Sequence, residues 1–258
     1  MVSKPDGNWP QITVIGICGI PEVRENDDLT AIILKAISDQ GVLLERGDIV
    51  VVTQKIISKA EGRTVDLIDI EPSPFALTIG RNTGSDPRHI EIVLRESRRI
   101  VRMDRGIIIA ETFHGFICAN AGVDASNVPG ESCVTLLPHD SDKSADEIRK
   151  NLEMHTGFPV SVIVSDTFGR PWREGTTNVA IGVSGISPLK DYRGTEDEHG
   201  YELRVSVAAW ADEIAGCADL VLGKTDGIPV ALVRGLDYPP CADSISVLLR
   251  PPEKDMFR

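Results

Sequence analysis

The stretch Ile49-Val50-Val51-Val52-Thr53 indicates the fold more clearly than any other part of the sequence. It is a continuous apolar run that begins after the turn-forming pair Gly47-Asp48. Runs without alternating polar residues are typical of strands buried on both faces in α/β proteins. Residues 160–164 form a second run of this kind, so two buried strands are predicted.

Helices and further strands are predicted around these two runs. Helices are expected at residues 27–39, from residues 72–74, from residue 87, and at residues 141–155 and 206–222. Strands are expected at residues 12–15, 107–110, 116–118, 179–183 and 228–233. Because no regular strand–helix–strand repeat runs through the chain, we expect a mixed α/β (α+β) fold. Residues 1–258 contain no internal repeat and no linker, which predicts a single domain of two closely packed α/β subdomains.

Charge and composition exclude several classes of protein. At a formal net charge of −12 the chain lacks the basic face that a nucleic-acid partner needs. No apolar run approaches the length that spans a membrane. The five cysteines are scattered and none has CxxC spacing, which predicts reduced thiols in a cytoplasmic protein. An acidic protein that binds an anionic substrate usually needs a divalent metal ion or a few local basic residues.

Residues 218–225 fit a relaxed Walker A pattern, with Ala218 in the place of the first glycine. A true phosphate-binding loop follows a strand and precedes a helix. Here a helix is predicted to precede Gly223 and a strand to follow, so we expect a helix C-cap and not a Walker-type P-loop fold. Lys224 and Thr225 are kept as candidate phosphate contacts.

Residues 120–127 are small and polar and lie just beyond a predicted strand. Asp124, Ser126 and Asn127 offer oxygens that suit a hard cation or a ribose hydroxyl. An Asx-type turn, in which these side chains bind their own backbone, explains the same residues. Residue chemistry alone favours the turn slightly.

Residues 165–170 directly follow the predicted strand 160–164, and we expect them to form a loop. Ligands bind α/β proteins at the carboxyl ends of strands. Asp166 and Thr167 could share Mg²⁺ or Mn²⁺, and Arg170 and Arg173 could hold a phosphate or carboxylate. A capped turn with surface arginines is the equally weighted alternative.

Residues 54–63 follow the first buried strand and place Lys55, Lys59 and Arg63 in what we expect to be a basic loop. In so acidic a protein, such a loop is a candidate phosphate cradle. The alternative is a solvated basic stretch, because lysines are mostly exposed.

Several stretches, in this order along the chain, resemble those of one known family. They are Gly19-Ile20-Pro21-Glu22, residues 51–63, residues 121–128, residues 164–170, Ala211-Asp212-Glu213-Ile214-Ala215, and residues 228–235. Together they resemble the coenzyme F420-0:gamma-glutamyl ligase family and cover nearly the whole chain. Each stretch alone is a weak signal, but the ordered set is specific.

The resemblance implies a GTP-dependent ligase with a fold of its own. Members join L-glutamate to the carboxylate of F420-0, the deazaflavin precursor of coenzyme F420, and further gamma-linked glutamates can follow. GTP would phosphorylate that carboxylate to an acyl phosphate, which the glutamate amine then attacks. The cofactors implied are one or two Mg²⁺ or Mn²⁺ ions, with K⁺ as a further candidate, and members pair as homodimers.

The resemblance also implies residue roles. Asp124 and Asp166 match ligands of one metal ion and Thr167 matches a ligand of a second. The nucleotide contacts that it implies are Ile20, Pro21, Glu22, Val23, Gln54, Lys59 and Asn127, with Lys59 at the phosphates. Asp124, Asp166 and Lys59 are therefore the expected catalytic residues, and Lys55 is a neighbour without an assigned match.

One segment departs from the family pattern. Archaeal members carry an acidic second-metal ligand where this chain has Lys224 in a shorter segment, so either a ligand is lost or Asp226 replaces it. Residues 248–257 resemble the point where longer bacterial members continue into a flavin domain, and no FMN is expected here. The alternatives are a ligase of this fold that acts on another carboxylate, and a nucleotide-binding module that has lost catalysis.

Overall fold

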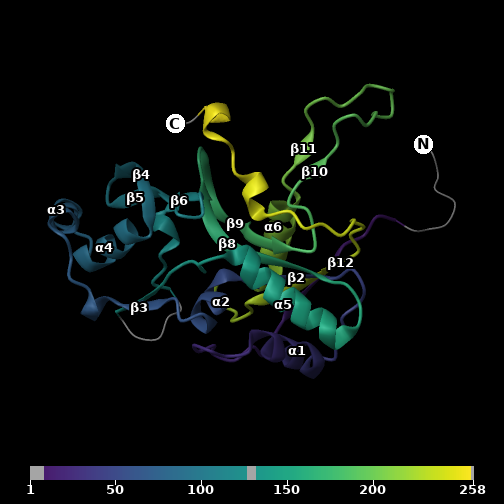
Figure 1. Ribbon diagram of the computed structural model, residues 1–258, viewed down its shortest axis with the longest axis horizontal. Helices are drawn as coiled ribbons and strands as arrows, with labels where there is room; N and C mark the ends of the chain where they lie inside the picture. Colours follow the sequence, from purple (N-terminus) through teal and green to yellow (C-terminus); the bar gives the residue numbers. More distant parts are fainter. Residues whose placement is uncertain (1–8, 127–131, 257–258) are drawn as a thin grey trace.

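The computed structural model describes residues 9–126 and 132–256, and its centre is a five-stranded mixed sheet (Figure 1). The strand order is β1 (Thr13–Ile17), β12 (Val230–Arg234), β2 (Ile49–Thr53), β8 (Ser161–Arg170) and β9 (Arg173–Ser184). Only β2 and β8 run parallel to each other. Residues 49–52 and 162–164 are fully buried, which confirms both strands predicted from the apolar runs.

Helices α5 (Ser141–Thr156) and α6 (Trp210–Leu222) cover opposite faces of this sheet. A side chain at Gly16 would meet Val221 of α6, whereas one at Gly182 would meet Ser141 of α5. Gly16 and Val183 lie in the same row of paired residues across the sheet and therefore face the same side. Gly182 is adjacent to Val183 in β9, so it faces the other side. Both glycines allow a helix to approach the sheet closely.

Two further helices contact both the sheet and each other. Helix α1 (Leu29–Asp39) begins at Asp28, whose carboxylate accepts a hydrogen bond from the Ala31 amide, and it packs against α5. Helix α2 (Gln54–Ala60) follows β2 without a loop. Its first residue therefore lies directly at the carboxyl end of a central strand.

A second, smaller apolar core lies beside the sheet, on the left of Figure 1. It is built from η1 (Leu67–Asp69), α3 (Pro74–Thr83), α4 (Pro87–Arg95), β4 (Ser97–Asp104), β5 (Ile107–Thr112), β6 (Ile117–Ala119) and η2 (Asn120–Gly122). The short pair β3 (Thr64–Asp66) and β7 (Cys133–Thr135) joins it to the rest of the chain. Pro74 and Pro87 each open a helix, as the sequence predicts.

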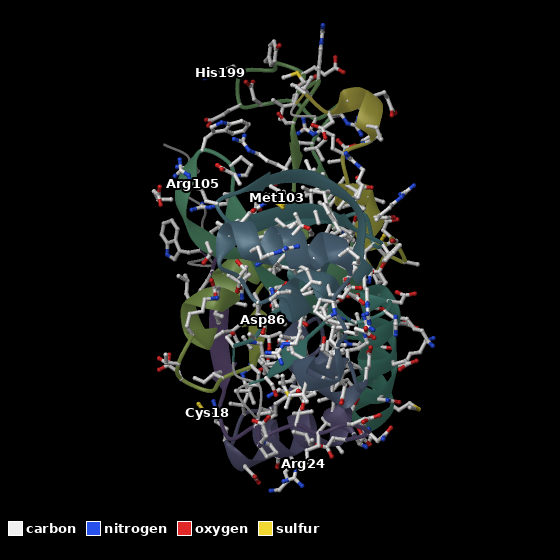
Figure 2. All side chains as sticks on the ribbon, turned by 90° about the vertical axis from the view of Figure 1, so that its left-hand side faces the viewer. Cys18, Arg24, Asp86, Met103, Arg105 and His199 are labelled. Atoms are coloured by element: carbon white, nitrogen blue, oxygen red, sulfur yellow. The ribbon has the colours of Figure 1, made fainter. Side chains whose placement is uncertain are left out.

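The segment after β9 extends away from the sheet. Strands β10 (Lys190–Asp191) and β11 (Val207–Ala208) form the base of a long exposed hairpin. Figure 2 shows His199 of this hairpin at the opposite end of the molecule from Arg24. The chain continues through η3 (Ile245–Leu248) and η4 (Pro252–Lys254). No helix in the described part of the chain is long and apolar enough to cross a membrane.

Two of the predicted loops are wrong. Residues 165–170 continue strand β8, because their backbone pairs with β9 and this pairing does not require apolar side chains. Residues 54–60 form helix α2 rather than a basic loop, since Gln, Lys, Ile and Ala sustain a helix directly after the strand. The C-cap prediction is confirmed: Gly223 ends α6 with a positive φ of 62° and β12 follows, the reverse of the Walker order.

Candidate active site

A cavity of about 850 Å³ lies where β2 ends beside β8, which continues further along β9. Thr53 pairs with Ser165 in the parallel ladder, so Gln54 and Asp166 follow at the same edge of the sheet. This is the edge at which α/β proteins bind ligands.

The cavity collects the metal and nucleotide residues that the family resemblance implies and that lie in the described part of the chain, whereas the other candidates Arg63, Arg170 and Asp226 do not line it. Its lining includes Ile20, Pro21, Glu22, Val23, Gln54, Lys59, Asp124, Asp166, Thr167, Lys224 and Thr225. Asn127 lies outside the described residues. Segments that are far apart in sequence therefore meet in one place.

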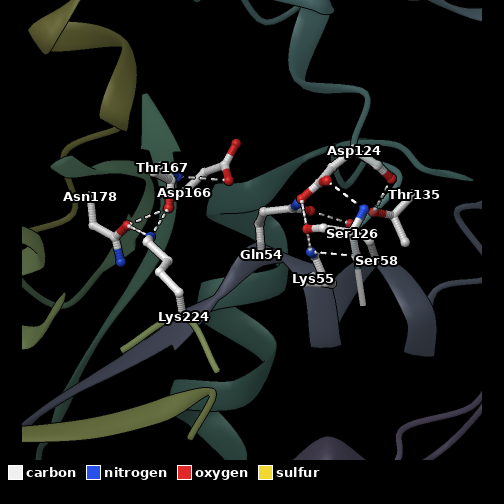
Figure 3. A network of polar contacts seen from close by, with 10 residues as sticks. All are labelled: Gln54, Lys55, Ser58, Asp124, Ser126, Thr135, Asp166, Thr167, Asn178 and Lys224. Carbon is white, nitrogen blue, oxygen red and sulfur yellow. Dashed lines mark hydrogen bonds and ion pairs between the residues drawn. The ribbon is translucent and has the colours of Figure 1, made fainter. Parts of the chain in front are cut away.

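Asp124 is held by a lysine from helix α2. Lys55 Nζ lies 2.8 Å from Asp124 Oδ2 and donates to Ser126 Oγ at 2.7 Å (Figure 3). The Ser126 amide donates to Asp124 Oδ1 at 2.7 Å, so the predicted Asx-type turn is present as well. Burial opposes ionisation of Asp124, but the hydrogen bonds from Lys55 and Ser126 outweigh it and lower the pKa. Asp124 is therefore a fixed anion at the rim of the cavity.

Asp166 has a different environment from Asp124. Its carboxylate accepts a hydrogen bond from the Thr167 amide at 2.8 Å, and no basic side chain forms an ion pair with it among the described residues. Burial, together with the negative charge of Asp124, raises its pKa to about 6. Figure 3 shows this carboxylate between the Asp124 group and a second polar group around Lys224.

The second group consists of Thr167, Asn178 and Lys224. Lys224 Nζ donates to Thr167 Oγ1 at 2.6 Å, and the Thr167 hydroxyl donates to Asn178 Oδ1 at 2.6 Å. Asn178 is only 4% exposed and comes from β9, which pairs with β8. The sequence prediction missed Asn178, because an isolated asparagine just before the apolar run 179–183 carries no motif.

Lys59, also on helix α2, lines the cavity beside residues 20–23. Its ammonium is 2.5 Å from Glu22 Oε1, and the residue is only 8% exposed. Gln54, the first residue of α2, is buried and accepts a hydrogen bond from Ser58, one turn later. The lining thus contains three lysines (Lys55, Lys59, Lys224) and three carboxylates (Glu22, Asp124, Asp166). An anionic ligand that also brings a metal ion would suit this balance of charges.

The residues around Asp166 fit one divalent cation. Two carboxylates lie close enough for one to raise the pKa of the other, and Ser165 Oγ is buried without a hydrogen-bond partner among the described residues. In the described part of the chain no three His, Cys, Asp or Glu side chains gather as a metal site. Mg²⁺ in nucleotide sites typically takes one or two carboxylates and completes its shell with phosphates and water. Asp124 and Asp166 match that pattern.

Asp166 is expected to titrate near pH 6 in protein treated with a chelator, so that it is mostly protonated below pH 5 and ionised above pH 7. Asp124→Asn should lower this pKa, since it removes a like charge and leaves Lys55 without its partner. Carboxyl ¹³C NMR titration measures both values. Asp191→Asn, in the exposed hairpin, is the matched control and should leave the pKa of Asp166 unchanged. An unchanged or higher pKa in Asp124→Asn would contradict the coupling of the two carboxylates.

Comparison with known proteins gives consistent matches over most of the chain. Residues 18–235 match the family model described as F420-0:Gamma-glutamyl ligase. A relative from Methanothermobacter thermautotrophicus, called coenzyme F420:L-glutamate ligase, is 44% identical over 96% of this chain and 99% of its own length. Relatives of the same name from Methanopyrus kandleri and Methanocaldococcus jannaschii are also 44% identical, over 98% and 83% of this chain and 100% and 86% of their own lengths.

Proposed function

The chain belongs to the F420-0:gamma-glutamyl ligase family, and on that premise we propose that it joins L-glutamate to the carboxylate of F420-0 with GTP as the energy source. Its relatives are named as ligases of glutamate and coenzyme F420. The observation that carries the proposal is the convergence of the family-matched residues on one cavity beside the carboxyl end of β2 and the adjoining part of β8.

The proposed reaction has two steps. A carboxylate is a poor electrophile, so the γ-phosphoryl group of GTP is first transferred to an oxygen of the F420-0 carboxylate, which releases GDP. The neutral amine of glutamate then attacks the carbonyl carbon of the acyl phosphate. The C–O bond to phosphate breaks, inorganic phosphate leaves, and the new amide nitrogen loses its proton.

The chain's own side chains would hold the reactants in this arrangement. Lys59 supplies a positive charge for the phosphates, and Gln54 and residues 20–23 line the adjoining wall beside the nucleotide. Asp124 and Asp166 would hold the divalent ion, which supplies positive charge where phosphate and carboxylate oxygens meet. Lys55 keeps Asp124 in place through its 2.8 Å ion pair.

The direct test is a reaction of the purified protein with F420-0, GTP, L-glutamate and Mn²⁺, followed by mass spectrometry of the product and measurement of GDP. We expect a glutamylated product and GDP release that depends on F420-0. GDP release with a different carboxylic acid, and none with F420-0, would instead indicate a ligase for another substrate. Absence of GDP release under all conditions would overturn the proposed function. Homodimer formation, K⁺ binding and cytoplasmic location stay predictions.

A further inference from the structure

Lys224 is held by oxygen atoms from three different elements. It follows Gly223, the C-cap of α6, and its ammonium reaches across the cavity to β8 and β9. Nζ lies 2.6 Å from Thr167 Oγ1, 3.5 Å from Asn178 Oδ1 and 3.5 Å from Asp219 Oδ1. These oxygens form a cradle around one positive charge.

The Thr167 hydroxyl takes part in two hydrogen bonds around Lys224. Its hydroxyl gives its single proton to Asn178 Oδ1 and accepts a hydrogen bond from Lys224. The buried amide of Asn178 therefore orients a lone pair of Thr167 toward the ammonium. A divalent ion bound to Thr167 Oγ1 would have to displace the ammonium or lie beside it, and like charges at that separation repel.

Lys224 also differs from the other two lysines of the cavity in its accessibility. Its side chain is 56% exposed, compared with 18% for Lys55 and 9% for Lys59. Its bond to Thr167 is to a neutral hydroxyl, and its carboxylate neighbour Asp219 is 3.5 Å away. The ammonium has three N–H donors, and two of its three oxygen contacts are as long as 3.5 Å, so these two can be exchanged for a further anionic ligand inside the cavity.

We propose that the Lys224 ammonium takes the place of a second divalent ion, so that the site binds one divalent ion per chain and Lys224 contacts a phosphate of the nucleotide directly. This inference rests on the proposed function, because it concerns the same nucleotide site. It assigns Thr167 and Asn178 to the positioning of Lys224 rather than to metal binding. The oxygen atoms that could bind a metal cation already surround the Lys224 ammonium, which is a side chain of the protein itself.

The test is the number of Mn²⁺ ions bound per chain in the presence of GDP, measured by electron paramagnetic resonance of free Mn²⁺. We expect one ion for the unaltered protein and one for Lys224→Gln. We expect two for Lys224→Glu, because a carboxylate there would complete an oxygen set with Thr167, Asn178 and Asp219. Lys254→Glu, which makes the same charge change on exposed η4, should keep one ion.

Calorimetry of GDP binding with Mn²⁺ gives the second readout. Lys224→Gln should weaken GDP binding about tenfold, since one charged hydrogen bond to phosphate is lost. Thermal unfolding of each variant checks that the fold is retained.

The outcomes separate this inference from the proposed function. Two Mn²⁺ ions on the unaltered protein with GDP, or an unchanged GDP affinity in Lys224→Gln, would overturn the role of Lys224 and leave the proposed ligase standing. A protein that binds neither GDP nor Mn²⁺ would overturn both.

Discussion

Replacing Asp166 by asparagine is expected to lower kcat for F420-0-dependent GDP release about a thousandfold or more. Asp166 is the cavity carboxylate without an ion-pair partner among the described residues, and it is one of the two that would hold the divalent ion. A metal ion supplies several kcal/mol of charge stabilisation in phosphoryl transfer, and each 1.36 kcal/mol corresponds to a factor of about ten in rate. Asparagine keeps the shape of the side chain but removes the charge.

The fold should tolerate this substitution. The Asp166 carboxylate accepts a hydrogen bond from its neighbour Thr167, and the asparagine oxygen can accept the same bond. Its raised pKa also means that ionised Asp166 is disfavoured by its surroundings, so a neutral side chain should not destabilise the protein. The melting temperature should therefore stay within a few degrees of its original value, and Mn²⁺ binding should be lost.

The matched control for Asp166→Asn is Asp191→Asn in the exposed hairpin, which should keep full activity. An Asp166→Asn protein with normal kcat and normal Mn²⁺ binding would remove Asp166 from the proposed metal site. Loss of activity together with unfolding would indicate a structural role instead.

Replacing Arg234 by methionine is expected to reduce the free energy of unfolding by about 3–5 kcal/mol, the typical effect of leaving a buried charge without its partner. Arg234 ends β12, and Asp48, which is 0% exposed, precedes β2 in the neighbouring position of the sheet. Arg234 Nε and Nη2 each donate to a different oxygen of Asp48 at 2.8 Å. The same guanidinium binds Glu45 and the Leu43 carbonyl.

The stability of Arg234→Met is measured by urea unfolding. Arg193→Met is the matched control, because its partner Asp191 is half-exposed in the hairpin, and it should cost less than about 1 kcal/mol. Adding Asp48→Asn to Arg234→Met should recover part of the loss, since it removes the uncompensated charge. Equal, small effects of Arg234→Met and Arg193→Met would show that the Asp48 pair does not stabilise the sheet.

Apolar patterning predicted the main elements of the fold. The buried runs 49–53 and 160–164 are central strands, and Pro74 and Pro87 open helices as expected. The pattern failed where polar residues occupy regular structure, at residues 165–170 of β8 and residues 54–60 of α2. There the backbone is paired by a neighbouring strand or by the helix itself, and side-chain polarity carries no information about that pairing.

The candidate site was predicted as a set of residues but not as a set of contacts. Asp124, Asp166, Thr167, Lys59 and Lys224 were all named, and all line one cavity. Lys55 was expected only as part of a basic loop and Asn178 was missed, although both bind predicted site residues. Their partners are distant in sequence: Lys55 and Ser126 are 71 residues apart, and Asn178 and Lys224 are 46 apart.

The sequence by itself determined the buried strands, the helix that precedes Gly223 and the stretches that carry the chemistry, because burial and capping depend on residues that are close along the chain. Only the tertiary structure decided that Lys55 neutralises Asp124, that Asp166 stays without an ion pair among the described residues, and that Lys224 occupies the oxygen cradle at Thr167. Those pairings depend on strand register and on where α2 and α6 end against the sheet. Electrostatic interactions fall off with distance in space, whatever the separation in sequence.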